Sequence, residues 1–332
     1  MSGSVTVAER RTRAMGSAVH VVVVSERDRA GALADRAVAR VAGLEARWSR
    51  FRDDSELSRI NAADGAPCLV SDDTAALVGS LRDAWVTTAG RFDPTVSVAR
   101  LGYTTSFDTL NPPISGLPTS GAARVDRGFV APGCADVEVD RSLGLVRVPA
   151  GVTLDAGGLG KGLAADLVAD ETMRAGAAGV LVNVGGDVAV AGTPLGGGPW
   201  TLSIEAPDGD RHDPDPHDRD SDEVGRVVLA AGGVATSTSA RRRWRDATGA
   251  VVHHLLDPVT GRPAVSERRQ VTVVAASARD AEVAAKCVFL DGVLPALART
   301  ALVVDAWGAV TTLGGDSDVR FWIATPVGGD PR

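Results

Sequence analysis

The sequence predicts an α+β fold with mixed β-sheets and flanking helices, and three observations favour it. Strand-like and helix-like segments are mixed along the 332 residues without the strict alternation of an α/β protein. No segment repeats at a fixed period. Apolar residues recur at helical spacing in several long segments, and short strand-like runs stand between them.

The first half of the chain predicts a strand at 18–25, a helix at 28–50, a short helix at 54–61, a helix at 71–88 and a hairpin at 137–148. The helix at 28–50 is predicted by apolar residues at helical spacing, namely Leu33, Ala37, Val41, Leu44 and Trp48. Asp54 opens the short helix as an acidic cap, and Gly90 ends the helix at 71–88. Residues 102–133 are rich in Gly, Pro, Ser and Thr, so we expect a loop there.

In the second half, a strand at 152–155 and a helix at 163–171 are expected on either side of a glycine-rich segment. Further strands are expected at 180–184, 200–205, 227–231 and 271–275, followed by helices at 278–290 and 293–300. A closing set of strands is expected near 303, at 310–313 and at 321–323.

We expect a single domain at 15–325, preceded by a flexible N-terminus at 1–14 and followed by a tail at 326–332. Within it, residues 207–223 hold seven aspartates and one glutamate, and we expect a disordered acidic loop. This loop resembles a calcium-binding loop only superficially. With Asp208 as the first position, the required Gly at position six and Glu at position twelve are missing.

Composition excludes several classes of function. The net charge is −7, and no basic run is interleaved with aromatic residues, so nucleic acid is not expected as a partner. The three cysteines, Cys68, Cys134 and Cys287, are far apart, which suits a reducing compartment and excludes a cysteine-based zinc site. The polar N-terminus lacks the apolar core of a signal or membrane segment. We therefore expect a cytoplasmic protein without a membrane anchor.

The segment 154–166 is the strongest chemical signal in the chain. Its four glycines would let backbone N–H groups approach a ligand at a helix N-terminus, and Lys161 adds a positive charge, as in a phosphate cradle. A tight strand-to-helix connection without a ligand is the alternative. The P-loop pattern fails because Gly162 follows Lys161. A dinucleotide-binding pattern fits from Gly160 to Ala165, but the strand–helix alternation of that fold is missing.

Other polar, glycine-containing segments join this loop in a recognisable order. Together they resemble the ApbE family, the FAD:protein FMN transferases, over about residues 15–290. The resemblance rests on these segments: Met15–Ser17, Ser49–Asn61, Arg91–Val96, Asp155–Asp166, Asn183–Asp187, Ala235–Ser237 and His254–Pro263. The last one, His-x-x-Asp-Pro-x-Thr-Gly-x-Pro, is the most specific.

The resemblance implies a cleft between two lobes that binds FAD, and transfer of its FMN half to a threonine or serine hydroxyl of an acceptor protein. A phosphoester forms, AMP is released, and Mg²⁺ normally supports the reaction. By position, these residues are expected to bind the flavin nucleotide: Met15, Phe51, Arg91, Phe92, Asp93, Asp155, Gly157, Lys161, Asn183, Gly185, Gly186, Asp187, Leu256 and Asp257.

Three residues are expected to act in the chemistry. Lys161 would neutralise the pyrophosphate, and Lys286 is a candidate for the same task. His254 is the candidate general base, because an imidazole titrates near neutral pH. A hydrogen-bonded histidine that fixes the turn at Asp257 is the alternative for His254, and the neighbouring His253 leaves both open.

The expected metal site departs from the family pattern. In the family, a backbone carbonyl, here that of Gly158, holds magnesium together with an Asp and a Thr four residues apart on a late helix. Glu282 and Lys286 stand at those two positions. Three outcomes are open: magnesium is bound by Glu282 and the substrate phosphates, Lys286 replaces the ion, or metal-dependent catalysis is lost. We favour a transferase with an altered metal site, against an FAD pyrophosphatase or a non-catalytic FAD-binding protein.

Overall fold

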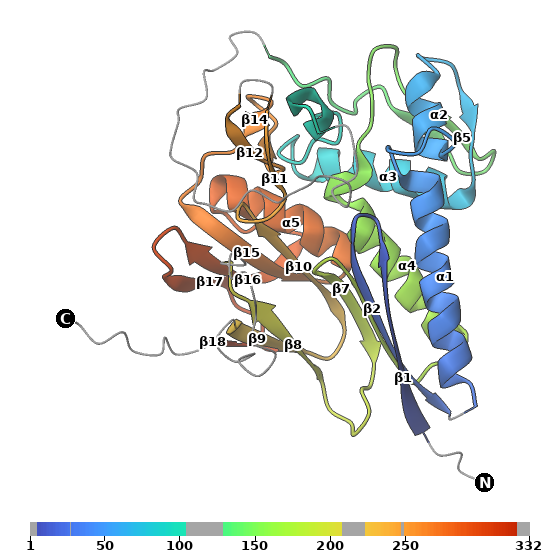
Figure 1. Ribbon diagram of the computed structural model, residues 1–332, viewed down its shortest axis with the longest axis vertical. Coiled ribbons are helices and arrows are strands. Elements are labelled where there is room, and N and C mark those ends of the chain that lie inside the picture. Colours follow the sequence, from blue (N-terminus) through green and yellow to red (C-terminus); the bar gives the residue numbers. More distant parts are fainter. Residues whose placement is uncertain (1–4, 27, 104–128, 208–222, 247–248, 324–332) are drawn as a thin grey trace.

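The computed structural model describes residues 5–26, 28–103, 129–207, 223–246 and 249–323. Its central feature is an antiparallel eight-stranded sheet (Figure 1). The strands lie in this order across it: β1 (Val5–Ala14), β2 (Ser17–Glu26), β6 (Gly179–Val184), β7 (Asp187–Gly192), β10 (Gly232–Thr238), β15 (Arg268–Ala275), β16 (Ala298–Asp305) and β17 (Val310–Gly314). The α+β class is therefore confirmed.

Helices and smaller sheets surround the large sheet (Figure 1). The helices are α1 (Ala30–Trp48), α2 (Glu56–Ala62), α3 (Asp72–Thr87), α4 (Gly160–Arg174) and α5 (Ala278–Asp291), with short 3₁₀ turns η1 (Val98–Leu101) and η3 (Ala156–Gly158). The small sheets are β18 (Val319–Ile323) with β9 (Glu223–Leu229) and β8 (Trp200–Glu205), β3 (Cys68–Leu69) with β5 (Leu145–Arg147) and β4 (Glu138–Asp140), β11 (Arg243–Arg245) with β12 (Val251–His253), and β13 (Leu256–Asp257) with β14 (Arg262–Pro263).

The large sheet is covered on both faces because its strands are apolar on both sides. In β2, Val21 and Val23 belong to the core shared with α1 and α4. Val22 and Val24 point the other way, into the core shared with β8, β9 and β18. Successive side chains of a strand face opposite sides, so one run of valines serves two cores.

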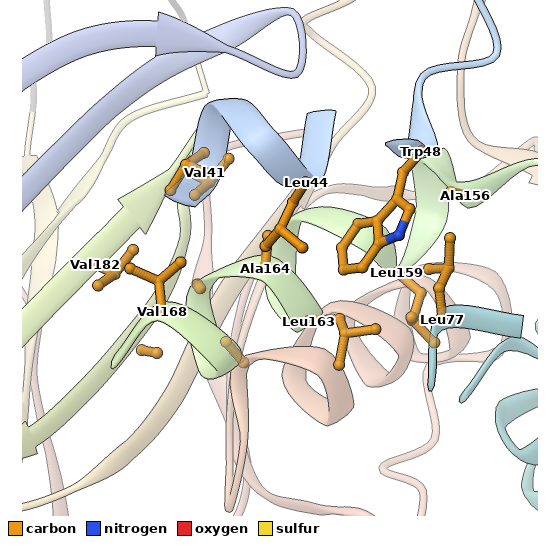
Figure 2. Packing of buried hydrophobic residues seen from close by; sticks show 14 of the residues in the cluster. Val41, Leu44, Trp48, Leu77, Ala156, Leu159, Leu163, Ala164, Val168 and Val182 are labelled. Carbon is orange, nitrogen blue, oxygen red and sulfur yellow. The ribbon is translucent and has the colours of Figure 1, made fainter. Parts of the chain in front are cut away.

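Helices α1 and α4 pack against each other through small and branched residues (Figure 2). Val41 and Leu44 of α1 are fully buried, as are Ala164 and Val168 of α4. Trp48 closes this core at the C-terminal end of α1. Ala156 and Leu159 of the glycine-rich segment belong to the same core. Packing against the end of α1 therefore fixes the position of this segment.

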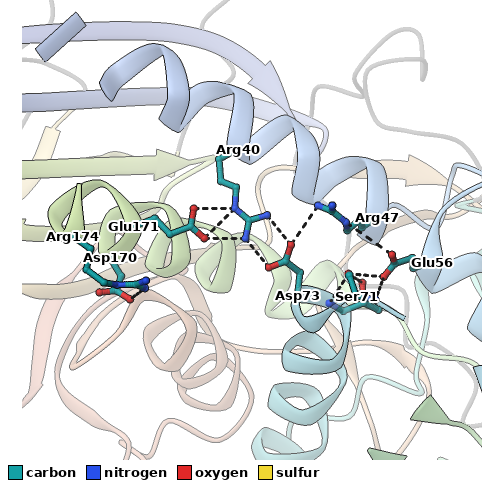
Figure 3. A network of polar contacts seen from close by, with 9 residues as sticks. Arg40, Arg47, Glu56, Ser71, Asp73, Asp170, Glu171 and Arg174 are labelled. Atoms are coloured by element: carbon teal, nitrogen blue, oxygen red, sulfur yellow. Dashed lines mark hydrogen bonds and ion pairs between the residues drawn. The ribbon is translucent and has the colours of Figure 1, made fainter. Parts of the chain in front are cut away.

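A charged network ties α1, α3 and α4 together (Figure 3). The guanidinium of Arg40 donates to Asp73 at 2.6 Å and to Glu171 at 2.9 Å. Arg47 also contacts Asp73 at 3.3 Å. The hydrogen bonds from Arg40 lower the pKa of Asp73, so both partners stay charged at neutral pH. Planar two-sided contacts of this kind fix the orientation of the three helices.

The expected flexible N-terminus is wrong for residues 5–14, which form β1. This strand pairs with β2 along its whole length, from Val5 opposite Glu26 to Ala14 opposite Ser17. The strand has charged residues, arginines and a glutamate, where an alternation of apolar and polar residues would have indicated a strand. Charged residues are usual in edge strands. The expected tail at 326–332 and residues 1–4 lie outside the described residues, as do 208–222 of the acidic loop and 104–128 of the loop expected at 102–133.

Two predicted elements are wrong. Residues 152–155 form no strand, because their backbone groups bond elsewhere: the amide side chain of Asn61 holds both the N–H and the carbonyl of Leu154, at 2.8 and 2.9 Å. The N–H of Asp155 donates to the carbonyl of Pro94 at 2.8 Å. The helix expected at 293–300 is replaced by a turn at Pro295 and the start of β16. Ser55, not Asp54, caps α2.

Candidate active site

A cavity of about 480 Å³ opens above the ends of α1, α4 and α5. Its walls come from the β1–β2 turn, the segment that follows α1, the loop before η1, the glycine-rich segment, the stretch before β13, and the C-terminal half of α5. Twelve of the predicted site residues line it: Met15, Phe51, Arg91, Phe92, Asp93, Asp155, Gly157, Gly158, Lys161, His254, Leu256 and Lys286. Segments far apart in the sequence therefore meet as expected.

The glycine-rich segment is held from both sides. Asp155 accepts hydrogen bonds from Gly157 N at 2.8 Å and from Ser97 Oγ at 2.7 Å, so its carboxylate holds the segment in place. Helix α4 begins at Gly160, three residues earlier than predicted. At Gly162 a Cβ atom would lie 2.5 Å from the carbonyl oxygen of Ala278. Glycine at this position therefore lets α4 approach α5 closely.

This close approach brings two lysines and a carboxylate together. Lys161 Nζ lies 2.9 Å from Oε1 of Glu282, and Lys286 Nζ lies 3.4 Å from the same oxygen. The second oxygen of Glu282 accepts from Gly162 N at 2.8 Å. Lys161 also donates to Asp187. Lys161, Glu282 and Asp187 are all at least 92% buried, with relative exposures of 8%, 1% and 3%.

The charges of this cluster decide its protonation. Burial alone would lower the pKa of Lys161, but the carboxylates of Asp187 and Glu282 outweigh it and raise that pKa. Burial lowers the pKa of Lys286 more than Glu282 raises it. Burial raises the pKa of Asp187 to about 6. The two lysines pull the pKa of Glu282 below its usual value in spite of burial.

Six predicted residues are not among those that line the cavity: Asn183, Gly185, Gly186, Asp187, Asp257 and Glu282. Asn183 Oδ1 accepts from Gly186 N at 2.8 Å and closes the β6–β7 turn. Gly185 packs so tightly on Ser17 that a Cβ atom would lie 2.5 Å from its hydroxyl oxygen. The turn therefore holds Lys161 and Ser17 in place through these contacts, and the direct ligand contacts expected from it stay a prediction.

Arg91 lines the cavity, but its charge is already paired. It donates to both oxygens of Asp291, at 2.8 and 2.5 Å, and to Asp257 at 3.1 Å. These bonds tie the end of α5 to the β13 turn. Asp93 likewise accepts from the backbone and hydroxyl of Thr95, at 2.8 and 2.6 Å, and shapes its own turn.

The two adjacent histidines have different surroundings. His253 Nε2 lies 3.2 Å from the carbonyl oxygen of Ala264, and its Nδ1 accepts from Leu255 N at 3.2 Å. Burial lowers its pKa to about 4. His254 lines the cavity, and its buried Nδ1 has no hydrogen-bond partner among the residues that the structure covers. The hydrogen-bonded histidine near the turn is thus His253, which leaves His254 for the cavity.

Arg50, Tyr103 and Arg242 are among the cavity residues that the sequence analysis did not name. Arg50 contacts Asp155 at 3.2 Å, and its guanidinium carbon lies 4.1 Å from the ring centroid of Phe51. Tyr103 packs edge-on against Phe51 with the ring centroids 5.9 Å apart. Arg242 donates to Ser17 Oγ at 2.7 Å from a backbone with φ of 53°. Tyr103 is the chain's single tyrosine, and Arg242 lies in the basic run 241–245; these were the available signals.

The residues at the expected metal position do not fit magnesium. No group of three or more His, Cys, Asp or Glu side chains that could hold a metal occurs within the described ranges. Both oxygens of Glu282 already accept hydrogen bonds, and an ammonium stands where the family pattern has a threonine hydroxyl. Magnesium needs near-octahedral oxygen ligands, and a lysine cannot supply one.

The chain matches the model of the ApbE family over residues 15–307. It belongs to the ApbE family. An FAD:protein FMN transferase of Salmonella typhimurium is 30% identical over 238 residues, which is 70% of this chain and 64% of that protein, so the match spans less than two thirds of its length. One of Klebsiella pneumoniae is 27% identical over 85% of this chain and 77% of that protein.

Solved structures of ApbE proteins agree with this assignment. The ApbE protein of Thermotoga maritima superposes with a TM-score of 0.74 at 26% identity, covering 92% of this chain and 96% of that one. This match confirms the fold expected from the ApbE resemblance. In the part of this ApbE protein that the structure describes, no helix has the length and apolar character needed to cross a membrane. A cytoplasmic location stays a prediction.

Proposed function

We propose that this protein transfers the FMN half of FAD to a threonine or serine hydroxyl of an acceptor protein. One observation carries the proposal: a cavity of about 480 Å³ combines aromatic walls with the ammonium groups of Lys161, which is buried, and Lys286, which is partly buried. Such a cavity suits a ligand with flat rings joined by a charged linker. The names of the matched relatives support the same activity.

The aromatic walls would hold the ring systems. Phe51 and Tyr103 present an edge-on pair, and the guanidinium of Arg50 stacks on Phe51. Leu256 and Phe92 add apolar surface on other walls of the cavity. Flat aromatic rings bind such surfaces through burial and stacking, without needing many hydrogen bonds.

Lys161 and Lys286 would hold the pyrophosphate. Both line the cavity, and both belong to the cluster around Glu282. Arg242, whose charge acts on Lys161, also lines the cavity. Phosphoryl transfer depends mainly on positioning and on neutralising charge, so fixed cations are the groups that this reaction needs.

In the reaction, the hydroxyl oxygen of the acceptor attacks the phosphorus of the FMN half and forms a phosphoester bond. The bond from that phosphorus to the bridging oxygen breaks, and its electron pair stays on that oxygen, which leaves with AMP. His254 would take the hydroxyl proton. Burial, and to a smaller extent the positive charge of Arg242, lowers the pKa of His254 well below its usual value. The ring is therefore neutral at pH 7, and its free nitrogen can accept a proton.

The test is incubation of the protein with FAD and a peptide that carries a threonine in a Ser-Gly-Ala-Thr context. Mass spectrometry of the peptide and chromatography of AMP are read together. A mass gain equal to FMN, with one AMP per modified peptide, supports the transferase. AMP formation without any modified peptide, also when a purified native acceptor replaces the peptide, would contradict it and indicate an FAD pyrophosphatase. Bound FAD without AMP under both conditions would indicate a binding protein.

A further inference from the structure

Lys286 stands at the position where the family pattern has a threonine, and its side chain contacts the expected metal site. Its Nζ atom lies 3.1 Å from the backbone oxygen of Glu282 and 3.4 Å from Oε1 of the same residue. Its Cε atom lies 3.3 Å from where a Cβ of Gly158 would stand. The side chain of Lys286 thus contacts both positions, 158 and 282, that were expected to hold magnesium, and its ammonium group is hydrogen-bonded to Glu282.

The chain contains two lysines, and both lie in this cluster. Lysines and arginines number 35 together, and Lys161 and Lys286 are the only two lysines among them. Both side chains reach the same oxygen of Glu282, at 2.9 and 3.4 Å. A lysine ammonium is a compact point charge with three donors, whereas an arginine is a flat fork. Of the two cationic side chains, the ammonium is closer to a metal ion, because its charge is concentrated at one point.

The charge balance at this end of the cavity argues in the same direction. Lys161, Lys286 and Arg242 supply three positive charges, and Asp187 and Glu282 supply two negative charges. A divalent cation would enter a region whose carboxylates are already paired with ammonium groups. A pyrophosphate, in contrast, finds an excess of positive charge before any metal is added.

We propose that the ammonium of Lys286, together with that of Lys161, takes the place of the divalent metal, so that this protein binds FAD and transfers FMN without one. The proposal rests on the proposed function and names the cation that it uses. The bonds that form and break are those given above. The two ammonium groups neutralise the negative charge that grows on the bridging oxygen as it leaves with AMP.

The first experiment measures the dissociation constant of FAD, by quenching of flavin fluorescence, in EDTA and in magnesium. For the unchanged protein we expect the two constants to agree within twofold. Lys286→Met should weaken binding at least tenfold in both media. The double variant Glu282→Asp with Lys286→Thr supplies the aspartate and threonine of the family pattern, so it should bind weakly in EDTA and recover at least tenfold in magnesium.

The matched control is Arg174→Met. Arg174 pairs with Asp170 at the same four-residue spacing on a helix, but both side chains are exposed and neither lines the cavity. Its FAD affinity should equal that of the unchanged protein. A magnesium-induced gain of tenfold or more in the unchanged protein, or unaltered binding by a folded Lys286→Met variant, would overturn the proposal.

A second measurement needs no variant. Acetic anhydride acetylates amines, so the lysine targets in the intact protein are Lys161 and Lys286 alone. In EDTA, FAD should slow acetylation of Lys286 at least fivefold, whereas riboflavin, which lacks the phosphates, should not. Bound FAD that leaves Lys286 unprotected contradicts the proposal. Failure of FAD to bind in any medium would instead overturn the proposed function; FAD binding that requires magnesium would overturn only the metal-free mechanism.

Discussion

Lys161 Nζ lies 2.9 Å from Oε1 of Glu282, and this contact joins the first turn of α4 to the second turn of α5. The same ammonium also binds Asp187 at the start of β7. One lysine therefore connects two helices and the central sheet directly beneath the cavity. Because all three side chains are buried, each relies on the others for its charge to be tolerated.

Removal of this lysine should destabilise the fold as well as the site. Lys161→Met leaves Asp187 facing Glu282 without the cation between them, so we expect the free energy of unfolding to fall by about 3–5 kcal/mol. Urea denaturation measures it, with the exposed pair variant Arg174→Met as control, for which no measurable change is expected. A loss below about 1 kcal/mol for Lys161→Met would contradict the structural role.

The helix contact at Gly162 predicts a contrast between two glycines. Gly162→Ala places a Cβ 2.5 Å from the carbonyl oxygen of Ala278 and should cost at least about 1–3 kcal/mol by forcing α4 away from α5. Gly43 lies inside α1, and its nearest neighbour to an added Cβ is an arginine side chain at 3.9 Å. Gly43→Ala should therefore stabilise the protein by about 0.5–1 kcal/mol. Thermal unfolding of both variants tests the contrast, and equal shifts would contradict it.

The pKa of His253 predicts a pH dependence of stability. Burial lowers it from 6.5 to about 4, so the folded state favours the neutral ring. This contribution is present above pH 6.5 and is lost as the pH falls toward 4, amounting to about 3 kcal/mol. Burial raises the pKa of Asp166 to about 6, which stabilises the folded state at low pH and is lost as the pH rises through 6.

His253→Gln separates the two effects, because Asp166 is the same in both proteins. The free energy of unfolding is measured from pH 8 to pH 4 for both proteins. Its fall over this range should be about 3 kcal/mol larger for the unchanged protein than for the variant. Parallel curves would show that the ring of His253 titrates normally in the folded state.

The role of His254 predicts a separation of rate from binding. His254→Asn should slow FMN transfer by about 100-fold or more and leave the dissociation constant of FAD within about twofold. Because the pKa of His254 lies well below 6.5, the transfer rate of the unchanged protein should stay constant from pH 8 down to 6.5. Single-turnover kinetics measure both effects. A rate that halves near pH 6.5 would contradict a neutral base with a lowered pKa.

Local elements were the most predictable part of this protein. The helix from Ala30 to Trp48 follows from the spacing of its apolar residues, which needs no knowledge of the rest of the chain. The strand predicted at 152–155 failed because a side chain from α2, Asn61, takes the hydrogen bonds that a neighbouring strand would have taken. A contact between residues 93 positions apart leaves no periodic trace in the sequence.

The sequence predicted which residues lie in the site better than it predicted what each residue does there. Motif positions brought most of the predicted residues to one cavity, yet Arg91 pairs with Asp291, and Asp187 binds Lys161 without lining the cavity itself. Such pairings depend on how the helices pack. The distinction between His253 and His254 likewise depends on which ring meets the carbonyl of Ala264. Tertiary contacts of this kind override any assignment from neighbouring residues alone.

The most direct test of the whole account is a crystal structure of the complete protein with FAD, grown in the presence of a chelator. We expect the pyrophosphate within hydrogen-bond distance of Nζ of both Lys161 and Lys286, and the flavin or adenine ring beside Phe51 and Tyr103. A pyrophosphate bound away from Lys286, or an FAD complex that forms only after magnesium is restored, would contradict the central claim that these two lysines replace the metal.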